Sequence, residues 1–328
     1  ATPLPTPRRN HRRGNGSALW VVLACAVGLT CLIGVGIGMA AAPPSADAVE
    51  MGRTFYQQAH ADWEAHHVES YSACIESTPE SDRKQCDDIN REPLATDFVP
   101  QPMLIMDALD ASAMIGAVVG SLLALIGGAT FWGAEYRHGT LATWLTFVPD
   151  RTRVWLAKSA VLVVWGALLT LVVEGVLMGI AAGSVVAWQG AAAASASPAA
   201  ALGVAGRGLA LGALASLVGG SLAVLFRQTV APALLPLAYL FLQAFAGLLY
   251  LIPGGDALTE WLPEQNISAF LNFGTTYVVS VQQVTAQGTT MAGVERTLSF
   301  AHGATYILVA VALVALGSLL SFRRRDVA

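Results

Sequence analysis

The sequence predicts an all-α membrane protein that crosses the bilayer six times, with both termini in the cytoplasm and an acidic insert outside. Three observations predict this fold class. Of the 328 residues, 55% are hydrophobic and only 12% are charged, about half the charged share of an average soluble domain. The charged residues gather in a few polar segments. Six apolar runs between these segments are each long enough to cross a hydrocarbon core of about 30 Å.

The first two segments are a basic tail and the first span. Residues 1–17 contain three prolines and a run of six polar residues from Arg8 to Arg13, which predicts a disordered cytoplasmic tail. Residues 18–42 are apolar or small, and this length suits a transmembrane helix and exceeds the core of a signal peptide. A signal peptide cleaved at Ala40-Ala41-Ala42 is the alternative.

Residues 43–104 form the predicted external insert, in which twelve acidic residues face four basic ones. The part from Ala46 to Ser72 has one glycine and no proline, so we expect a helix there, whereas four prolines interrupt the second half. Cys74 and Cys86 lie in this polar segment. They are the pair that can form a disulfide in an oxidising compartment, and two free thiols are the alternative.

Three potential metal ligands share one face of the predicted insert helix. His60, Glu64 and His67 are four and three residues apart, so a helix places them side by side. A fourth ligand for a tetrahedral zinc site is not evident. We therefore favour a solvated helix face over a metal site and expect no metal.

Residues 105–328 hold the other five spans, predicted at 111–132, 156–188, 208–226, 230–252 and 303–322. The segment 189–206 is rich in alanine and serine and predicts a flexible external linker, and 253–302 predicts an external segment of short or re-entrant helices. Twelve basic residues lie on the side of the termini and six on the other side. The positive-inside rule therefore places both termini in the cytoplasm.

Glu174 is the one acid deep inside an apolar span. An ionisable group in a bilayer costs a few kcal/mol, so its side chain is expected to face the protein interior. Two interpretations remain open: a site for a substrate cation or proton in a translocation path, and a protonated or hydrogen-bonded packing residue.

Four Gly-x-x-x-Gly pairs lie in apolar surroundings. This spacing predicts close helix packing, either within the chain or at a dimer seam. The pairs are Gly34–Gly38, Gly116–Gly120, Gly179–Gly183 and Gly208–Gly212.

A polar stretch of about residues 134–155, with Lys158 just beyond it, follows the second span. A Gly-Thr step interrupts the helical pattern and is followed by the amphipathic run 141–147, which predicts a short helix lying across the membrane surface. An ordinary loop whose basic residues only set the topology is the alternative. The residues that carry this prediction are Glu135, Tyr136, Arg137, His138, Gly139, Thr140, Arg151, Arg153 and Lys158.

Over about residues 128–160 the chain resembles the permeases of ABC-2-type exporters, in their actinobacterial style. The resemblance implies that these nine residues form a coupling site for a separate ATPase subunit, present in two copies, which binds ATP and Mg²⁺. It also implies a second permease chain, identical or different, and a plasma-membrane location. The implied cargo is hydrophobic or amphipathic, such as a drug, an antibiotic peptide or a lipid, and moves outward.

The sequence gives no support for catalysis by this chain or for binding of a nucleic acid or cofactor. The only lysines are Lys84, after Arg83, and Lys158, after Ala157, so no P-loop is present. A Gly-x-Ser-x-Gly elbow and a metalloprotease motif are also absent. Two other function classes remain as alternatives: a proton-coupled secondary transporter that uses Glu174, and a membrane-anchored sensor or assembly protein whose acidic insert binds a partner.

Overall fold

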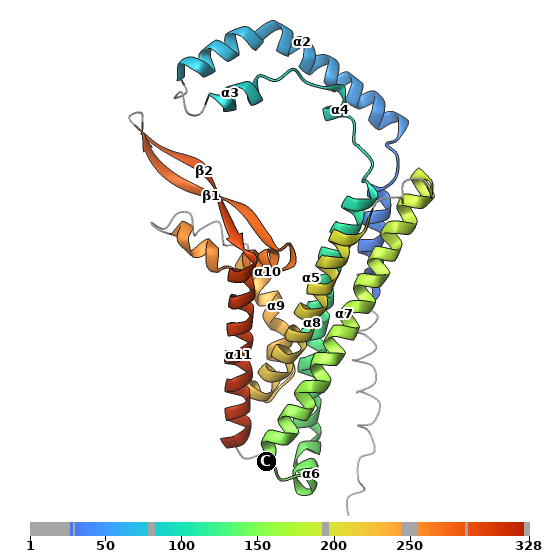
Figure 1. The fold of residues 1–328 in the computed structure, drawn as a ribbon, viewed down its shortest axis with the longest axis vertical. Coiled ribbons are helices and arrows are strands. Elements are labelled where there is room, and N and C mark those ends of the chain that lie inside the picture. The colour runs from blue at the N-terminus through green and yellow to red at the C-terminus, as the bar shows by residue number, and fades with distance from the viewer. Residues whose placement is uncertain are drawn as a thin grey trace, which may run out of the picture.

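The computed structural model describes residues 27–28, 30–77, 83–191, 197–243, 255–285 and 288–324 and is mostly helical. A helix over Thr30–Ala40 precedes the elements labelled in Figure 1. These are α2 (Ala46–Ser77), α3 (Lys84–Ile89), α4 (Ala95–Phe98), α5 (Ile105–His138), α6 (Thr140–Phe147), α7 (Arg151–Gln189), α8 (Ala199–Phe226), α9 (Val230–Gln243), the 3-10 helix η4 (Gly255–Trp261), α10 (Pro263–Leu271), β1 (Gly274–Thr285), β2 (Gly288–Ser299) and α11 (Phe300–Arg324).

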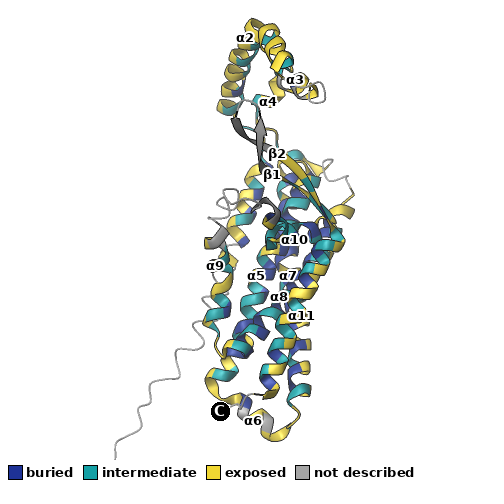
Figure 2. Ribbon diagram, turned by 90° about the vertical axis from the view of Figure 1, so that its left-hand side faces the viewer, coloured by how far each residue is buried: buried dark blue, intermediate teal, exposed yellow. Residues whose placement is uncertain are grey.

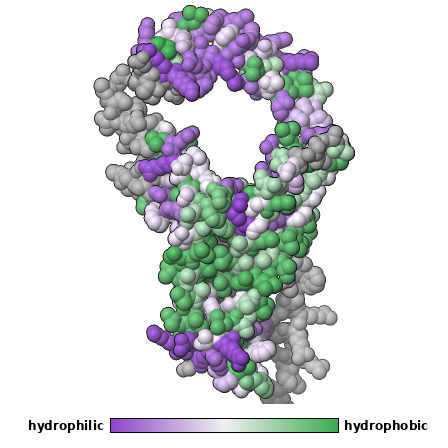
Figure 3. All heavy atoms as spheres, in the orientation of Figure 1, coloured by the Kyte–Doolittle hydropathy of each residue, from purple (hydrophilic) through white to green (hydrophobic). Residues whose placement is uncertain are grey.

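The chain is a membrane protein, because α5, α7, α8 and α11 are each long and apolar enough to cross a bilayer. The 39 residues of α7 span about 58 Å at 1.5 Å per residue, so this helix extends beyond a hydrocarbon core of about 30 Å. On the face drawn in Figure 3, a hydrophobic band lies across the bundle between hydrophilic ends. The first and fifth predicted spans are described only in part, by the Thr30–Ala40 helix and α9, so the six-span topology stays a prediction.

Glycines let α5, α7 and α8 pack against one another without a gap. A Cβ atom built on Gly208 of α8 would lie 1.9 Å from Oε1 of Glu174, and one built on Gly116 of α5 would lie 2.9 Å from the Cα of the same residue. Glu174 of α7 therefore fills the space that two glycines leave open. The buried residues of the bundle gather along this three-helix seam (Figure 2).

The same arrangement repeats one helical turn away. Thr170 of α7 lies between Gly120 of α5, with a Cβ-to-Cα distance of 2.9 Å, and Gly212 of α8, with a Cβ-to-Oγ1 distance of 1.9 Å. Two of the predicted glycine pairs thus serve packing within the chain. The pair Gly34–Gly38 also packs internally, against α7.

The pair Gly179–Gly183 behaves differently from the other three. A Cβ atom built on either glycine would meet no described atom within 4 Å, and Gly175, one turn earlier on α7, is equally open. This side of α7 therefore faces away from the described part of the bundle.

The prediction of a flexible linker over residues 189–206 is wrong for the second half of this segment. Helix α8 begins at Ala199, well before the predicted span at residue 208, and α7 continues to Gln189. Alanine has the highest intrinsic helix propensity, so the alanines after Pro198 extend the helix instead of forming a flexible connection.

The segment 253–302 contains a β-hairpin in addition to short helices. Strand β1 pairs antiparallel with β2, with Gly274 opposite Ser299 and Thr285 opposite Gly288. We expected only helices here, so this segment departs from the all-α prediction, although the membrane part is helical. The strands are rich in threonine and valine, β-branched residues that favour extended backbone.

The insert is built on one long helix, as predicted. Helix α2 runs without interruption over Ala46–Ser77, and the predicted disulfide joins Cys74 near its end to Cys86 of α3, with 5.9 Å between the Cα atoms. In the chain-entropy model, closing a loop of about a dozen residues stabilises the fold by about 3 kcal/mol. The bond therefore holds the returning chain against α2.

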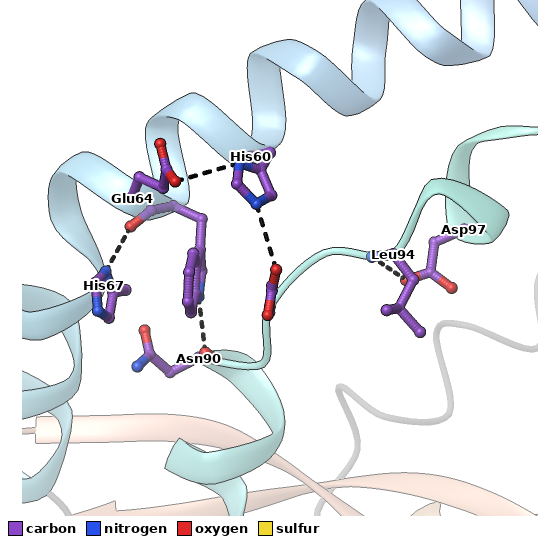
Figure 4. Close-up of polar contacts among 8 residues, drawn as sticks. His60, Glu64, His67, Asn90, Leu94 and Asp97 are labelled. Carbon is purple, nitrogen blue, oxygen red and sulfur yellow. Dashed lines mark hydrogen bonds and ion pairs between the residues drawn. The ribbon is translucent and has the colours of Figure 1, made fainter.

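His60 and Glu64, two of the weak metal candidates, take part in contacts within the insert (Figure 4). The Nε2 atom of His60 lies 3.3 Å from Oε1 of Glu92, and its Nδ1 atom lies 3.8 Å from Oε1 of Glu64. Both ring nitrogens of His60 thus have carboxylate neighbours, and the contact with Glu92 fastens α2 to the chain after α3.

His67, the third candidate, stacks on Trp63 with 4.2 Å between the ring centroids and donates from Nδ1 to the Trp63 carbonyl oxygen at 2.9 Å. The indole Nε1 of Trp63 donates to the Asn90 carbonyl oxygen at 2.9 Å. Within the described residues, no group of three His, Cys, Asp or Glu side chains is placed to hold a metal ion. On this helix face His60 and His67 pack within the insert, whereas the side chain of Glu64 is 66% exposed, as expected for a solvated face.

Candidate functional site

The nine predicted coupling residues lie at one end of the bundle, opposite the insert and the hairpin (Figure 1). Helix α5 ends at His138, and Gly139 adopts a φ of 65° before α6 begins at Thr140. This left-handed conformation is accessible to glycine because it lacks a Cβ atom. Gly139 therefore makes the break that the sequence predicts.

The connection from α6 to α7 is also specified locally. After Phe147 the backbone becomes extended at Val148. The carboxylate of Asp150 caps α7 by accepting from the backbone N–H groups of Thr152 at 3.0 Å and Arg153 at 3.2 Å. Such a cap contributes about 1 kcal/mol to helix stability. We call residues 135–158, comprising the end of α5, α6 and the start of α7, the elbow.

An ion pair between Glu135 of α5 and Lys158 of α7 holds the elbow together. The two side chains are only 18% and 13% exposed. The Lys158 ammonium also lies over the rings of Phe131, Trp132 and Trp144, at 5.5, 5.1 and 5.6 Å from their centroids. Because Trp144 belongs to α6, this one lysine contacts all three helices of the elbow.

A second set of contacts fixes the elbow to α11. Leu141 of α6 and Trp155 of α7 are buried in one cluster with Phe322 of α11. The indole Nε1 of Trp155 donates to Oγ of Ser318 at 3.1 Å, and Nη1 of Arg151 donates to the Phe322 carbonyl oxygen at 3.3 Å. The buried side of the elbow is therefore anchored at several points.

The opposite side of the elbow is exposed. Phe147 at the tip of α6 is 81% exposed, and Trp144 is 55% exposed. The side chains of Thr143 and Thr146 are also exposed, as are those of Arg137, just before α6 in the sequence, and Arg153, in the first turn of α7. We call the set Arg137, Thr143, Thr146, Phe147 and Arg153 the docking face. Exposed aromatic residues and arginines are typical of protein–protein interface centres.

The structure divides the nine predicted residues into two groups. Glu135, Lys158 and Arg151 make contacts within the chain, so we do not expect Glu135 and Arg151 to pair with charges on a partner. Tyr136 is half-buried, whereas the others are exposed: Arg137, His138, Gly139, Thr140 and Arg153. Sequence reasoning missed Trp144 and Phe147 as individual contributors, although both lie in the amphipathic run 141–147.

Glu174 lies in the middle of α7, away from the elbow. Its side chain is 1% exposed, and neither carboxylate oxygen has a hydrogen-bond partner among the described residues. The seam formed with Gly116 and Gly208 leaves no space beside it. This enclosure favours the packing interpretation, and a role in a translocation path stays a prediction.

Two substitutions at Glu174 distinguish packing from a role in transport. Glu174→Gln keeps the shape that fills the seam, so we expect unchanged transport and a loss of stability below about 1 kcal/mol. Glu174→Ala leaves a cavity between Gly116 and Gly208, which should cost about 2–3 kcal/mol. Thermal unfolding and cargo efflux are measured on both variants. Loss of efflux in Glu174→Gln at wild-type stability would contradict the packing interpretation.

No family model, curated protein or solved structure matches the chain. The assignment of a function therefore depends on the residues and the geometry of the elbow, together with the membrane-spanning architecture that surrounds it.

Proposed function

We propose that the chain is the membrane subunit of an ATP-driven exporter in the plasma membrane. Two such subunits, identical or different, form the path for a hydrophobic or amphipathic cargo. Two separate ATPase subunits, which bind ATP and Mg²⁺, dock on the elbows. The observation that carries the proposal is the elbow itself: a short helix between two long apolar helices, anchored on one side and exposed on the other.

The distribution of basic residues supports a cytoplasmic position for the elbow. Basic residues in membrane proteins favour the cytoplasmic side. The end of the bundle that carries α6 is rich in them, at Arg137, Arg151, Arg153, Lys158, Arg227, Arg323 and Arg324. An ATPase subunit in the cytoplasm would meet the docking face at this end.

The elbow is suited to transmit movement because its parts are tied together. The Glu135–Lys158 ion pair makes a displacement of α6 act on α5 and α7 jointly. Helix α7 runs unbroken to the other end of the bundle, where Nε2 of Gln189 donates to the carbonyl oxygens of Ala41 at 3.2 Å and Met103 at 2.9 Å. A movement at the elbow would reach the base of the insert through one rigid helix.

The chemistry of the docking face indicates how a partner would bind. Phe147 can insert into an apolar pocket on the ATPase subunit, and Arg137 and Arg153 can pair with carboxylates around it. Because these side chains are exposed, their replacement should leave the bundle intact.

We expect Phe147→Ala to lower cargo-stimulated ATPase activity by roughly tenfold, the size of a typical interface hot spot. Phe226→Ala is the matched control. Phe226 is an aromatic side chain that is 53% exposed, and it is the last residue of α8, at the same end of the bundle as α6. Arg137→Glu combined with Arg153→Glu should reduce stimulation further by turning attraction into repulsion. Activity is measured on the purified complex, with its thermal stability. Wild-type stimulation in both docking-face variants would refute the proposed coupling.

The two other function classes predict different results in the same preparations. A proton-coupled transporter would move cargo in vesicles that hold this chain alone, driven by a pH gradient. A sensor or assembly protein would show no cargo movement with or without an ATPase subunit. The enclosure of Glu174 within the three-helix seam argues against the first of these alternatives.

A further inference from the structure

A groove of about 630 Å³ lies at the neck of the insert, where its two connections meet the bundle. One connection leads from the Thr30–Ala40 helix to α2, and the other leads from α4 to α5. The walls are mainly apolar and include Met39, Pro43, Pro44, Pro102 and Leu104, with Asp107 at the start of α5. We call this feature the neck groove.

Hydrogen bonds and prolines hold the walls of the neck groove in place. The backbone N–H of Met103 donates to the Ala40 carbonyl oxygen at 3.0 Å, which joins the two connections directly. The side chain of Gln189 also joins the two connections, because its Nε2 atom donates to the carbonyl oxygens of both Ala41 and Met103. Prolines fix the backbone φ angle. A preformed site binds a ligand without the entropy cost of ordering its walls.

The neck groove is negatively charged. Asp107 is exposed and is the only charged residue among those that line it. No ion pair joins Asp107 to another described residue. Asp110, three residues further along α5, has a buried Oδ1 atom without a hydrogen-bond partner in the described part of the chain. The exposed carboxylate of Asp107, which lines the groove, attracts a cation and repels an anion.

We propose that the neck groove binds a cationic amphiphile, with its cationic group at Asp107 and its apolar body against Met39 and Leu104. These two side chains are 72% and 62% exposed, and exposed apolar surface in a hollow marks a ligand site. Methionine adapts to ligands of different shape. The occupant that we propose is a dissolved cation; anionic bilayer lipids are disfavoured because the carboxylate of Asp107 repels their headgroups, and zwitterionic lipids are distinguished by the test below.

The assignment of this ligand as exported cargo rests on the proposed function, but the binding itself does not. At the insert end of the bundle, the neck groove would be the place where a cationic cargo leaves the path or is sensed. Its coupling to α7 through Gln189 gives the site a direct connection to the helix that begins at the elbow.

The test uses rhodamine 6G, a cationic apolar dye, and the full chain in phosphatidylcholine nanodiscs, with empty nanodiscs as the blank. We measure dye affinity by fluorescence polarisation. The Asp107→Asn variant should bind rhodamine 6G about three- to fivefold more weakly than wild type, and the Asp107→Lys variant about tenfold more weakly. Asp88→Asn is the control, because Asp88 is an exposed acid of α3 outside the groove. The anionic dye anilinonaphthalene sulfonate should bind neither Asp107 variant more weakly than wild type, because neither substitution removes an attraction for an anion.

Equal affinity of wild type and Asp107→Asn at equal thermal stability would overturn the proposal. Loss of rhodamine binding when phosphatidylethanolamine replaces part of the phosphatidylcholine would also overturn it, by showing that a bilayer lipid occupies the groove. Dye binding requires neither ATP nor an ATPase subunit. If the dye-binding prediction fails but Phe147→Ala still lowers ATPase activity, only the proposal that the neck groove binds a cation is refuted. The exporter proposal is then unaffected.

Discussion

Gly219→Val is expected to destabilise the helix bundle by at least about 3 kcal/mol, because it forces apart two helix backbones. A Cβ atom on Gly219 of α8 would lie 1.9 Å from the carbonyl oxygen of Leu125 and 3.1 Å from the backbone nitrogen of Ala129, both in α5. Backbone atoms cannot move away by a change of rotamer. The clash can be relieved only by separating α5 from α8.

Gly179→Val provides the matched control for this prediction. Gly179 also lies inside a membrane-spanning helix, but a Cβ atom there meets no described atom within 4 Å, so we expect a change below about 1 kcal/mol. Thermal unfolding of the two variants in detergent, followed by size-exclusion chromatography, measures the difference. Equal unfolding temperatures would show that the α5–α8 contact does not hold the bundle together.

Lys158→Met is expected to destabilise the elbow by about 3 kcal/mol, because it leaves a mostly buried carboxylate without its partner. It also removes the contacts of the ammonium with Phe131, Trp132 and Trp144. Glu135→Gln should cost only about 1 kcal/mol, because Lys158 then keeps its three aromatic neighbours. The asymmetry follows from Lys158 contacting all three helices of the elbow.

A solvent-exposed ion pair is the control for the elbow. The side chains of Arg91 and Asp97 are 64% and 42% exposed, so Arg91→Gln should change stability by less than about 1 kcal/mol. Unfolding curves of the three variants give the order, and accessibility of a cysteine placed at Thr143 reports loosening of α6. Equal losses in Lys158→Met and Glu135→Gln would contradict the role of the aromatic rings.

Much of the membrane architecture follows from local properties of the sequence. The apolar runs predict α5, α7, α8 and α11, because length and hydrophobicity alone decide whether a helix can cross a bilayer. The long insert helix follows from a stretch without proline. Packing of Gly116–Gly120 and Gly208–Gly212 follows from their spacing, whereas the open surface at Gly179–Gly183 does not, because spacing says nothing about which helix lies opposite.

The parts that the sequence does not predict depend on contacts between distant residues. The hairpin has only a weak local signal, the β-branched residues of 274–299, and its pairing is a tertiary property. In the elbow, the break at Gly139 is evident from the sequence, but the Glu135–Lys158 pair joins residues 23 positions apart. The exposure of Phe147 is likewise a tertiary property, because the burial of Leu141 against the bundle decides which side of α6 faces outward.

A photo-crosslinking amino acid at position 147, in the full chain in its own cells, tests the central claim most directly. We predict a crosslinked product that contains a P-loop ATPase, identified by mass spectrometry, and no such product from the same amino acid at Phe226. Crosslinks from position 147 that reach only lipid or this chain itself, in cells where the variant is present in the membrane at the wild-type level, would contradict docking of an ATPase subunit on the elbow.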